Sequence, residues 1–243
     1  MKPFKFKEFT INQDKCAMKI GTDGVLLGAW TSVNDKTYSI LDIGAGTGVI
    51  ALMLAQRSHA ETIEAIELDD AAYEQCMENF EDSIWADRLF CFHASFDEFV
   101  DEYTAEDPED AELYDLIVSN PPFYTEEVTS GDDARDNARQ NLSLPFDELV
   151  SGASKLLSPK GIFATIIPFK EEVGFIALAE KEKLFPIRVT RVRGNKDAEI
   201  KRSLLAFGFE HRSPKIDELI IEIERNTYTQ DYIDLTKDFY LKM

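Results

Sequence analysis

The chain has 243 residues, of which 44% are hydrophobic, and this is enough to bury a substantial core in a single domain, 1–243. Its 46 acidic side chains outnumber 26 basic ones, and the net charge of −20 excludes a protein that coats nucleic acid by general positive charge, although a locally basic RNA site stays open. No apolar run exceeds seven residues, so no membrane-spanning helix is expected, and three scattered cysteines without a CxxC motif predict a reducing, cytoplasmic setting.

Short β-rich runs alternate with helical stretches along the chain, which predicts an α/β fold with a Rossmann-like, doubly wound, mostly parallel sheet. Strands are expected at 38–43, 62–67, 88–93, 113–119 and 162–167, then at 187–193, 203–209 and 218–224, with antiparallel pairing among the C-terminal ones. Helices are expected at 25–30, 48–57, 70–80, 146–157, 171–183 and 230–240. The segment 101–112 holds seven acids and no base, which favours a solvated loop.

A glycine-rich loop follows the first predicted strand directly. Three glycines at alternate positions come after Asp42, namely Gly44, Gly46 and Gly48. Glycine permits a sharp turn and a close ligand approach, and the next helix offers free N–H groups at its start. A dinucleotide-binding loop would carry its third glycine where Val49 stands, so the spacing argues against NAD. Glu67, at the end of the second strand, is placed to accept hydrogen bonds from a ribose diol.

This loop, taken with Glu67, resembles the cofactor motif of the class I S-adenosylmethionine methyltransferases. The resemblance implies that the loop passes beneath the methionine and ribose of the cofactor and that Glu67 holds the ribose hydroxyls. In those enzymes an Asp at the end of the third strand often binds the adenine amine. The stretch here is His93-Ala94-Ser95-Phe96, so Ser95 or the backbone near Phe96 is expected to take that place.

The fourth predicted strand ends in Asn120-Pro121-Pro122-Phe123. Two prolines cannot donate to a sheet ladder, so the strand stops in a stiff turn at the carboxyl edge, where ligands of such folds lie. The Asn120 side chain and the Pro121 carbonyl accept hydrogen bonds, and Phe123 offers a flat ring, which suits a planar group bearing an amine. Acceptors that favour the amine hydrogens as the nitrogen becomes tetrahedral would stabilise the transition state.

The Asn-Pro-Pro-Phe motif resembles the catalytic motif of amino methyltransferases, which act on adenine N6, cytosine N4 or a glutamine side-chain amide. Methyltransferases with this motif often carry an N-terminal segment that closes over the charged methionine end of the cofactor. Thr22 and Asp23, just before an apolar helix, are candidates for that role. The alternative is that one of them caps the helix.

A closer resemblance covers nearly the whole chain. The segment FTINQDKCAMKIGTDGVLLGAW, the glycine loop, NPPF and the ending LTKDFYLKM resemble the bacterial tRNA1(Val) adenine-37 N6-methyltransferase family. The resemblance implies a cytoplasmic enzyme that uses S-adenosylmethionine to methylate adenine 37 of a valine tRNA, with no obligate protein partner. The domain then divides into a cofactor-covering segment (1–35), a cofactor-binding half (36–168) and the C-terminal half of the sheet with a tail (169–243).

A tRNA substrate requires a docking surface on an acidic protein. The stretch 181–215 holds ten bases and four acids, so Arg191 and Arg193 are candidate RNA contacts, although ordinary exposed bases explain the same pattern. Arg135 and Arg139 follow the catalytic motif and are expected where the backbone of the target base passes. A base stacked in an anticodon loop must be splayed out to reach Phe123.

Two other readings of the function stay open. The acceptor could be a protein glutamine N5 or an adenine in DNA or ribosomal RNA; the acidic surface favours a protein, whereas the basic stretch and the family-like ends favour RNA. The chain could also be a non-catalytic binder of nucleotide-like ligands, against which the intact Asn-Pro-Pro-Phe motif argues. The three histidines show no ligand spacing, so no metal site is expected.

Overall fold

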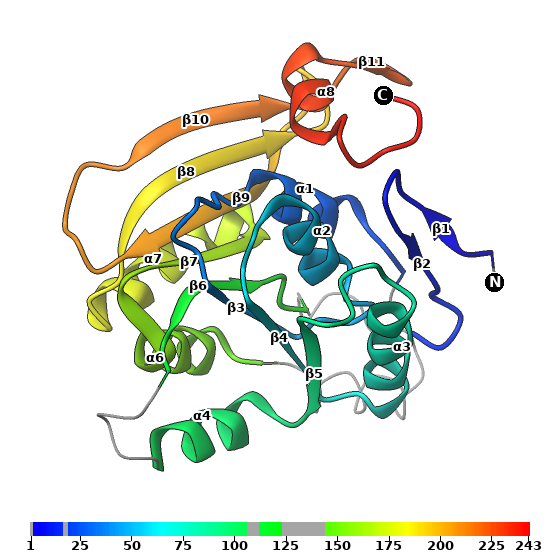
Figure 1. The fold of residues 1–243 in the computed structure, drawn as a ribbon. Coiled ribbons are helices and arrows are strands. Elements are labelled where there is room, and N and C mark those ends of the chain that lie inside the picture. Colours follow the sequence, from blue (N-terminus) through cyan, green and yellow to red (C-terminus); the bar gives the residue numbers. More distant parts are fainter. Residues whose placement is uncertain (1, 17–18, 106–111, 123–143) are drawn as a thin grey trace, which may run out of the picture.

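The computed structural model describes residues 2–16, 19–105, 112–122 and 144–243. The described residues form an eight-stranded sheet in the order β10-β8-β9-β7-β6-β3-β4-β5 (Figure 1). Its strands are β3 (Ser39–Ile43), β4 (Thr62–Glu67), β5 (Leu89–His93), β6 (Tyr114–Ser119), β7 (Leu157–Pro168), β8 (Phe185–Arg193), β9 (Ile200–Gly208) and β10 (Lys215–Ile220). Neighbouring strands are parallel except where β9 pairs antiparallel with β7 and β8. The expected doubly wound fold with antiparallel C-terminal pairing is confirmed.

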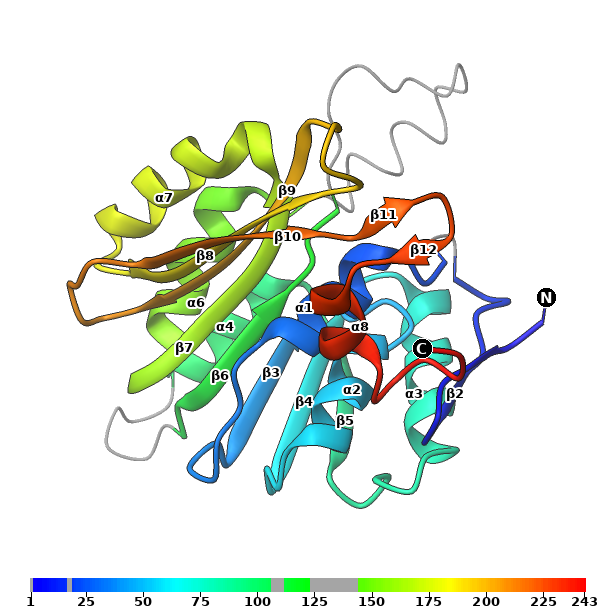
Figure 2. The same ribbon diagram turned by 90° about the horizontal axis from the view of Figure 1, so that it is seen from above.

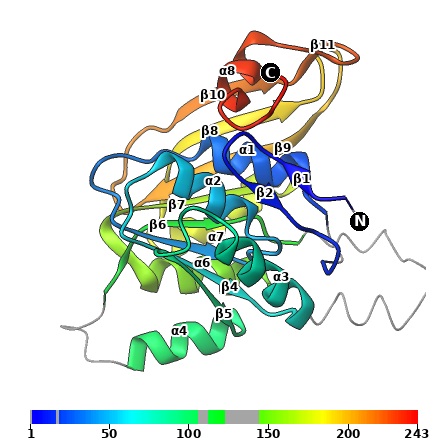
Figure 3. The ribbon, with the colours of Figure 1, turned by 45° about the vertical axis from the view of Figure 1, so that its right-hand side comes forward.

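Helices cover both faces of the sheet (Figure 3). The first face carries α1 (Thr22–Trp30), α2 (Val49–Arg57), α3 (Asp70–Glu81) and α8 (Gln230–Thr236). The second carries α4 (Phe96–Ala105), α6 (Phe146–Leu156) and α7 (Glu172–Lys181). Side chains alternate along each strand, so Ile40 belongs to the first apolar core whereas Leu41 and Ile43 belong to the second. Among the described helices, none has the length and hydrophobicity to cross a membrane.

The predicted loop 101–112 is wrong in its first part, because α4 runs through residue 105. The start of α4 has a capping box: Ser95 Oγ donates to Glu98 Oε2 at 2.8 Å, and the Glu98 N–H donates to Ser95 Oγ at 3.4 Å. Phe96, Phe99 and Val100 are buried against the second face. Burial of this apolar side therefore stabilises the helix, although the end of the helix is acidic.

The C-terminal predictions also need correction. β7 begins at Leu157, directly after α6, five residues before the start that the sequence predicts at 162. The strand predicted at 218–224 is divided: β10 ends at Ile220, and β11 (Glu222–Glu224) pairs with β12 (Thr227–Tyr228) outside the main sheet. Pro168 ends β7, and a 3-10 turn, η1 (Phe169–Glu171), leads into α7.

The two ends of the described chain lie side by side (Figure 2). β1 (Phe4–Lys5) and β2 (Thr10–Ile11) form a small hairpin that the sequence did not predict. Phe6, between them, bridges Tyr240, and the Lys7 N–H donates to the Phe239 carbonyl at 2.9 Å. The N-terminal hairpin and the C-terminal tail therefore form one surface beside α1.

The carboxyl ends of the parallel strands converge on one edge of the sheet. Ser119 of β6 is in register with Ile43 of β3, and Glu67 of β4 with His93 of β5. The glycine loop, the turn after Glu67, the turn after β5 and Asn120 consequently emerge together. We refer to this side as the carboxyl edge.

Candidate active site

The three glycines of the loop serve two different purposes. Gly44, Gly46 and Gly48 have φ angles of +72°, +58° and +77°, a backbone region that other residues adopt at a cost. Apart from its chain neighbours, no described residue would lie within 4 Å of a Cβ on Gly44 or Gly46, so both face space that a ligand can fill. A Cβ on Gly48 would lie 2.6 Å from Phe80 Cε1, because this residue packs against α3.

Glu67 joins the loop to the end of β4. Its Oε2 accepts a hydrogen bond from the Gly46 N–H at 2.7 Å, and its Oε1 accepts one from the Asp69 N–H at 2.8 Å. Burial raises the pKa of this carboxyl group, and the two backbone hydrogen bonds oppose that rise. Each oxygen retains acceptor capacity, so the carboxylate is oriented and can still accept from a ligand hydroxyl.

Asp42 lies beneath the loop and is fully buried. Its Oδ2 accepts a hydrogen bond from the Ala51 N–H at 3.1 Å, in the first turn of α2, and its Oδ1 has no hydrogen-bond partner among the described residues. Burial is the main cause that raises the pKa of Asp42 to about 7. This placement supports a role in holding the loop and helix together, and direct contact with the cofactor stays a prediction.

The third predicted cofactor position is the turn after β5. Ser95 is half-buried, and its hydroxyl takes part in the capping box of α4 described above. The His93 ring stacks on Tyr73 at 5.1 Å, and His93 Nε2 lies 3.0 Å from the Leu68 carbonyl oxygen. These contacts link the turns after β4 and β5, and contact of Ser95 with the cofactor stays a prediction.

Asn120 follows β6 at the carboxyl edge. No hydrogen bond to any described residue occupies its side-chain amide. Pro121 is buried and Pro122 half-buried, whereas Phe123 lies outside the described residues. The amide is thus held on a stiff backbone with its donors and acceptor available to a substrate.

Helix α1 closely approaches this position. A Cβ on Gly24 would lie 3.3 Å from Val49 Cγ1 and 4.0 Å from Asn120 Nδ2, and one on Gly28 would lie 2.8 Å from Met53 Sδ. Two glycines one helical turn apart therefore let α1 pack tightly on α2. Sequence reasoning missed this contact, although the Gly-x-x-x-Gly spacing indicates a close helix approach.

The alternative that Thr22 or Asp23 caps α1 is wrong. The N-cap residue is Gly21, without a side-chain capping bond, and both candidates lie in the first turn. Thr22 is exposed, and Asp23 Oδ2 accepts a hydrogen bond from Arg202 Nε at 2.8 Å. This ion pair attaches the start of α1 to β9 across the sheet edge.

Comparison with known proteins agrees with this geometry. The model of the methyltransferase small domain family matches residues 21–173. A tRNA1(Val) (adenine(37)-N6)-methyltransferase of Flavobacterium johnsoniae is 61% identical over 99% of this chain and 100% of its own length. One of the same name from Bacteroides fragilis is 43% identical over 99% and 98%. The chain belongs to the tRNA1(Val) (adenine(37)-N6)-methyltransferase family.

Membership of this family confirms the resemblance seen in the sequence. Among solved structures, a predicted O-methyltransferase from Agrobacterium tumefaciens matches with a TM-score of 0.66 and 17% identity, covering 89% of this chain and 96% of that one, and it shows the shared fold alone. The protein is a methyltransferase whose methyl donor is S-adenosylmethionine. The open space above Gly44 and Gly46 and the oriented Glu67 carboxylate fit that cofactor.

Two of the basic residues expected to contact RNA form ion pairs within the protein. Arg191 donates to the buried carboxylate of Glu172, from Nη2 at 2.7 Å and from Nε at 3.2 Å, and lies over the Phe169 ring. Arg193 donates to Glu218 Oε2 at 2.7 Å. Both arginines hold neighbouring elements to β8, so their contact with RNA stays a prediction without support from their surroundings.

The sheet also divides the basic stretch in space. Because β8 and β9 are antiparallel, the connection 194–199 and the start of β9 lie at the carboxyl edge, whereas the segments before β8 and after β9 lie at the opposite edge. Lys196 and Lys201 are exposed on the carboxyl edge, and neither side chain has an ion-pair partner among the described residues. Sequence reasoning did not single them out. Arg135 and Arg139 lie outside the described residues.

Proposed function

We propose that this protein transfers the methyl group of S-adenosylmethionine to the N6 amine of adenine 37 in a valine tRNA. Relatives of that name cover nearly the whole chain at up to 61% identity among those compared. The observation that carries the proposal is the side-chain amide of Asn120, which follows β6 beside the glycine loop and has no hydrogen-bond partner among the described residues. A tRNA substrate also places the reaction in the cytoplasm.

The cofactor supplies an electrophilic methyl group, and the chain positions the acceptor. The Asn120 side-chain oxygen is suited to accept a hydrogen from the adenine amine, and the Pro121 carbonyl is suited to accept the other. As the amine nitrogen becomes tetrahedral, these acceptors stabilise it more than they stabilise the planar ground state. Phe123 is expected to stack on the base. Alignment, without a strong base, then carries the catalysis.

The N-terminal segment completes the site in this proposal. Residues 1–35 would cover the cofactor, because the close approach of Gly24 brings α1 against Val49 at the start of α2 and beside Asn120. The Asp23–Arg202 ion pair holds the first turn of α1 to β9. Thr22 and Asp23 would then approach the charged methionine end, while residues 36–168 bind the remainder of the cofactor.

The proposal is tested by methylation of a valine tRNA transcript, followed by nucleoside mass spectrometry. We expect N6-methyladenosine with the natural transcript and none when adenine 37 is replaced by guanine. The Asn120→Ala protein is the matched control and should form little product while binding the cofactor. Methylation of the guanine-37 transcript at another adenine, or of a glutamine in a protein fraction and no tRNA, would contradict the proposal.

A further inference from the structure

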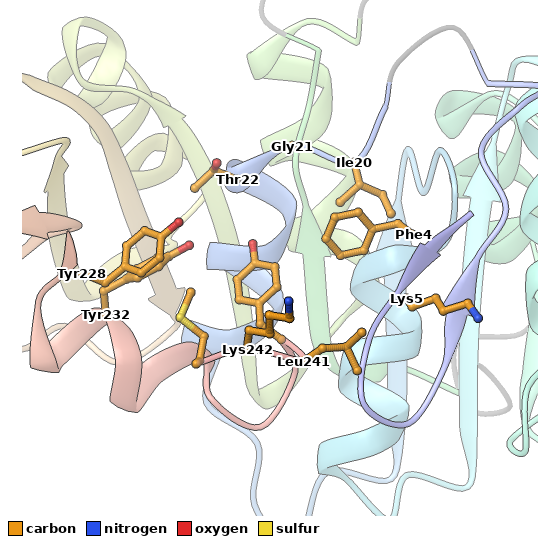
Figure 4. Close-up of a pocket in the computed structure, with 11 residues that line it drawn as sticks. Phe4, Lys5, Ile20, Gly21, Thr22, Tyr228, Tyr232, Leu241 and Lys242 are labelled. Atoms are coloured by element: carbon orange, nitrogen blue, oxygen red, sulfur yellow. The ribbon is translucent and has the colours of Figure 1, made fainter. Parts of the chain in front are cut away.

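A cavity lies apart from the glycine loop, between the N-terminal hairpin, the start of α1 and the C-terminal elements (Figure 4). Its volume is about 410 Å³. No residue of the loop 44–48 lines it, so it lies outside the glycine loop, although Thr22, a candidate to approach the cofactor, is part of its wall. The size falls at the lower end of the range for small-molecule pockets and is ample for a planar base.

Aromatic side chains make up much of the wall. Tyr228 and Tyr232 stand on one side with ring centroids 5.1 Å apart, and Phe4 faces them from the hairpin (Figure 4). Tyr240 contacts Phe4 edge to face at 6.2 Å. Tyr232 is only 4% exposed, so this wall is anchored in the core, whereas Tyr228 is half-buried and presents its ring to the cavity.

The cavity differs in charge from the rest of the molecule. Lys5 and Lys242 line it, and among the described residues no acidic side chain does, although the chain as a whole has a net charge of −20. Both lysines are exposed, and neither has an ion-pair partner among the described residues. An aromatic wall with a basic rim matches the two parts of a nucleotide, a base that stacks and a phosphate that attracts cations.

The position of the cavity connects it to the acceptor site. Thr22 lines the cavity at the first residue of α1, and Gly24, two residues later, lies beside Asn120. Successive residues of a helix rise by about 1.5 Å, so the two sites share the first turn of α1. Residues two apart on a helix point to nearly opposite faces, so an RNA strand whose target base reaches Asn120 would run around the start of α1 to reach this cavity.

We propose that this cavity binds a second, unpaired nucleobase of the tRNA, close in sequence to the target adenine. Tyr228 and Phe4 would stack on the base, and Lys5 and Lys242 would contact the flanking phosphates. RNA loops are recognised in this way, with unstacked bases splayed onto aromatic side chains. The inference rests on the proposed tRNA substrate and adds a subsite to it. It also gives an acidic enzyme a local means of holding RNA.

The test measures binding of fluorescent valine tRNA to the full protein. Tyr228→Ala should weaken binding roughly 5- to 150-fold, since base stacking on one ring contributes that factor. Tyr228→Phe should bind like the parent because it keeps the ring. Lys242→Gln should reduce the slope of log affinity against log salt by about one, as expected for a lost phosphate contact. Tyr38→Ala and Lys36→Gln are matched exposed controls near the start of β3, at the opposite edge of the sheet, and should change neither quantity.

Three further measurements separate the possible failures. Cofactor affinity and thermal unfolding of Tyr228→Ala should match the parent; a variant that loses stability but binds tRNA normally would show a packing role and overturn the inference. A 4-thiouridine placed beside position 37 should cross-link to Phe4 or Tyr228, and cross-linking confined to other elements would also overturn it. If the parent methylates adenine 37 and Tyr228→Ala binds equally well, only the subsite is wrong; if the parent does not methylate it, the proposed function itself fails.

Discussion

The glycine loop and the basic stretch 181–215 are equally conspicuous in the sequence, but the fold uses them differently. In the loop, each glycine stands where the backbone needs a positive φ, and Glu67 reaches Gly46 from the neighbouring strand. In the basic stretch, Arg191 and Arg193 are bound to acids, and antiparallel strands carry its members to opposite edges of the sheet. Backbone conformation is a local property, whereas the availability of a charge depends on its tertiary neighbours.

The largest effect on activity is expected at Asn120, which, like the glycine loop, belongs to a motif that can be recognised in the sequence. Asn120→Ala should lower kcat about 10²–10³-fold, the usual loss of one preorganised transition-state partner, with cofactor affinity unchanged. Asn120→Asp keeps an acceptor in the same place and should lose less. Steady-state kinetics with tRNA, together with calorimetry for the cofactor, measure both. If Asn120→Ala turned over at the parental rate, the Asn-Pro-Pro-Phe motif would have no catalytic role and would only form a turn.

Two alanine substitutions distinguish the roles of the glycines in the loop. Gly48→Ala should destabilise the protein by about 2–4 kcal/mol, because positive φ and the contact with Phe80 both oppose a Cβ. Gly46→Ala meets open space and should cost only about 1–2 kcal/mol in stability, while its Cβ intrudes on the cofactor and weakens binding. Denaturant unfolding and cofactor titration measure the two effects. Equal loss of stability would mean that the glycines do not differ in purpose.

The buried carboxyl group under the loop predicts a pH effect. The pKa of Asp42 is raised to about 7 in the folded protein, above its unfolded value of 3.8, so the folded state holds the proton more tightly and stability falls as pH rises from about 4 to 7. Asp42→Asn keeps an acceptor for Ala51 and removes the charge. The stability of the variant relative to the parent should therefore rise by about 2–3 kcal/mol between pH 5 and pH 8. Unfolding curves with the same pH dependence for both proteins would contradict the burial argument.

The smallest expected effects distinguish a basic side chain that stabilises the fold from one that binds RNA. Arg191→Gln leaves the buried Glu172 without its ion pair and should cost about 1–3 kcal/mol in unfolding free energy, with little change in the salt dependence of tRNA binding. Lys201→Gln should alter stability by less than about 0.5 kcal/mol and lower the salt slope by about one. Thermal unfolding and binding at several salt concentrations are the measurements. The reverse pattern would restore Arg191 as an RNA contact.

The errors in the secondary-structure prediction have physical causes. Helix α4 was missed because seven acids in 101–112 suggested solvent, although the capping box between Ser95 and Glu98 and the apolar face of the helix were present in the chain. β11 was merged with β10 because Ile221 carries no turn signal, and only pairing with β12 separates them. The start of α4 could have been predicted from its local capping residues. The boundary between β10 and β11 depends on pairing with β12, a partner strand.

The doubly wound order of elements, the glycine loop with Glu67, the Asn-Pro-Pro motif and the family could all be predicted from the chain. Each depends on residues that are close together in the sequence or on the spacing of a motif. Four relations could be seen only in the folded chain: Asp42 is buried under the loop, Asp23 pairs with Arg202, Gly24 lies beside Asn120, and Phe4 and Tyr228 line one cavity. These relations join residues up to 224 positions apart. Their burial, ion pairing and contact follow from which surfaces the sheet brings together, a property that no single segment carries.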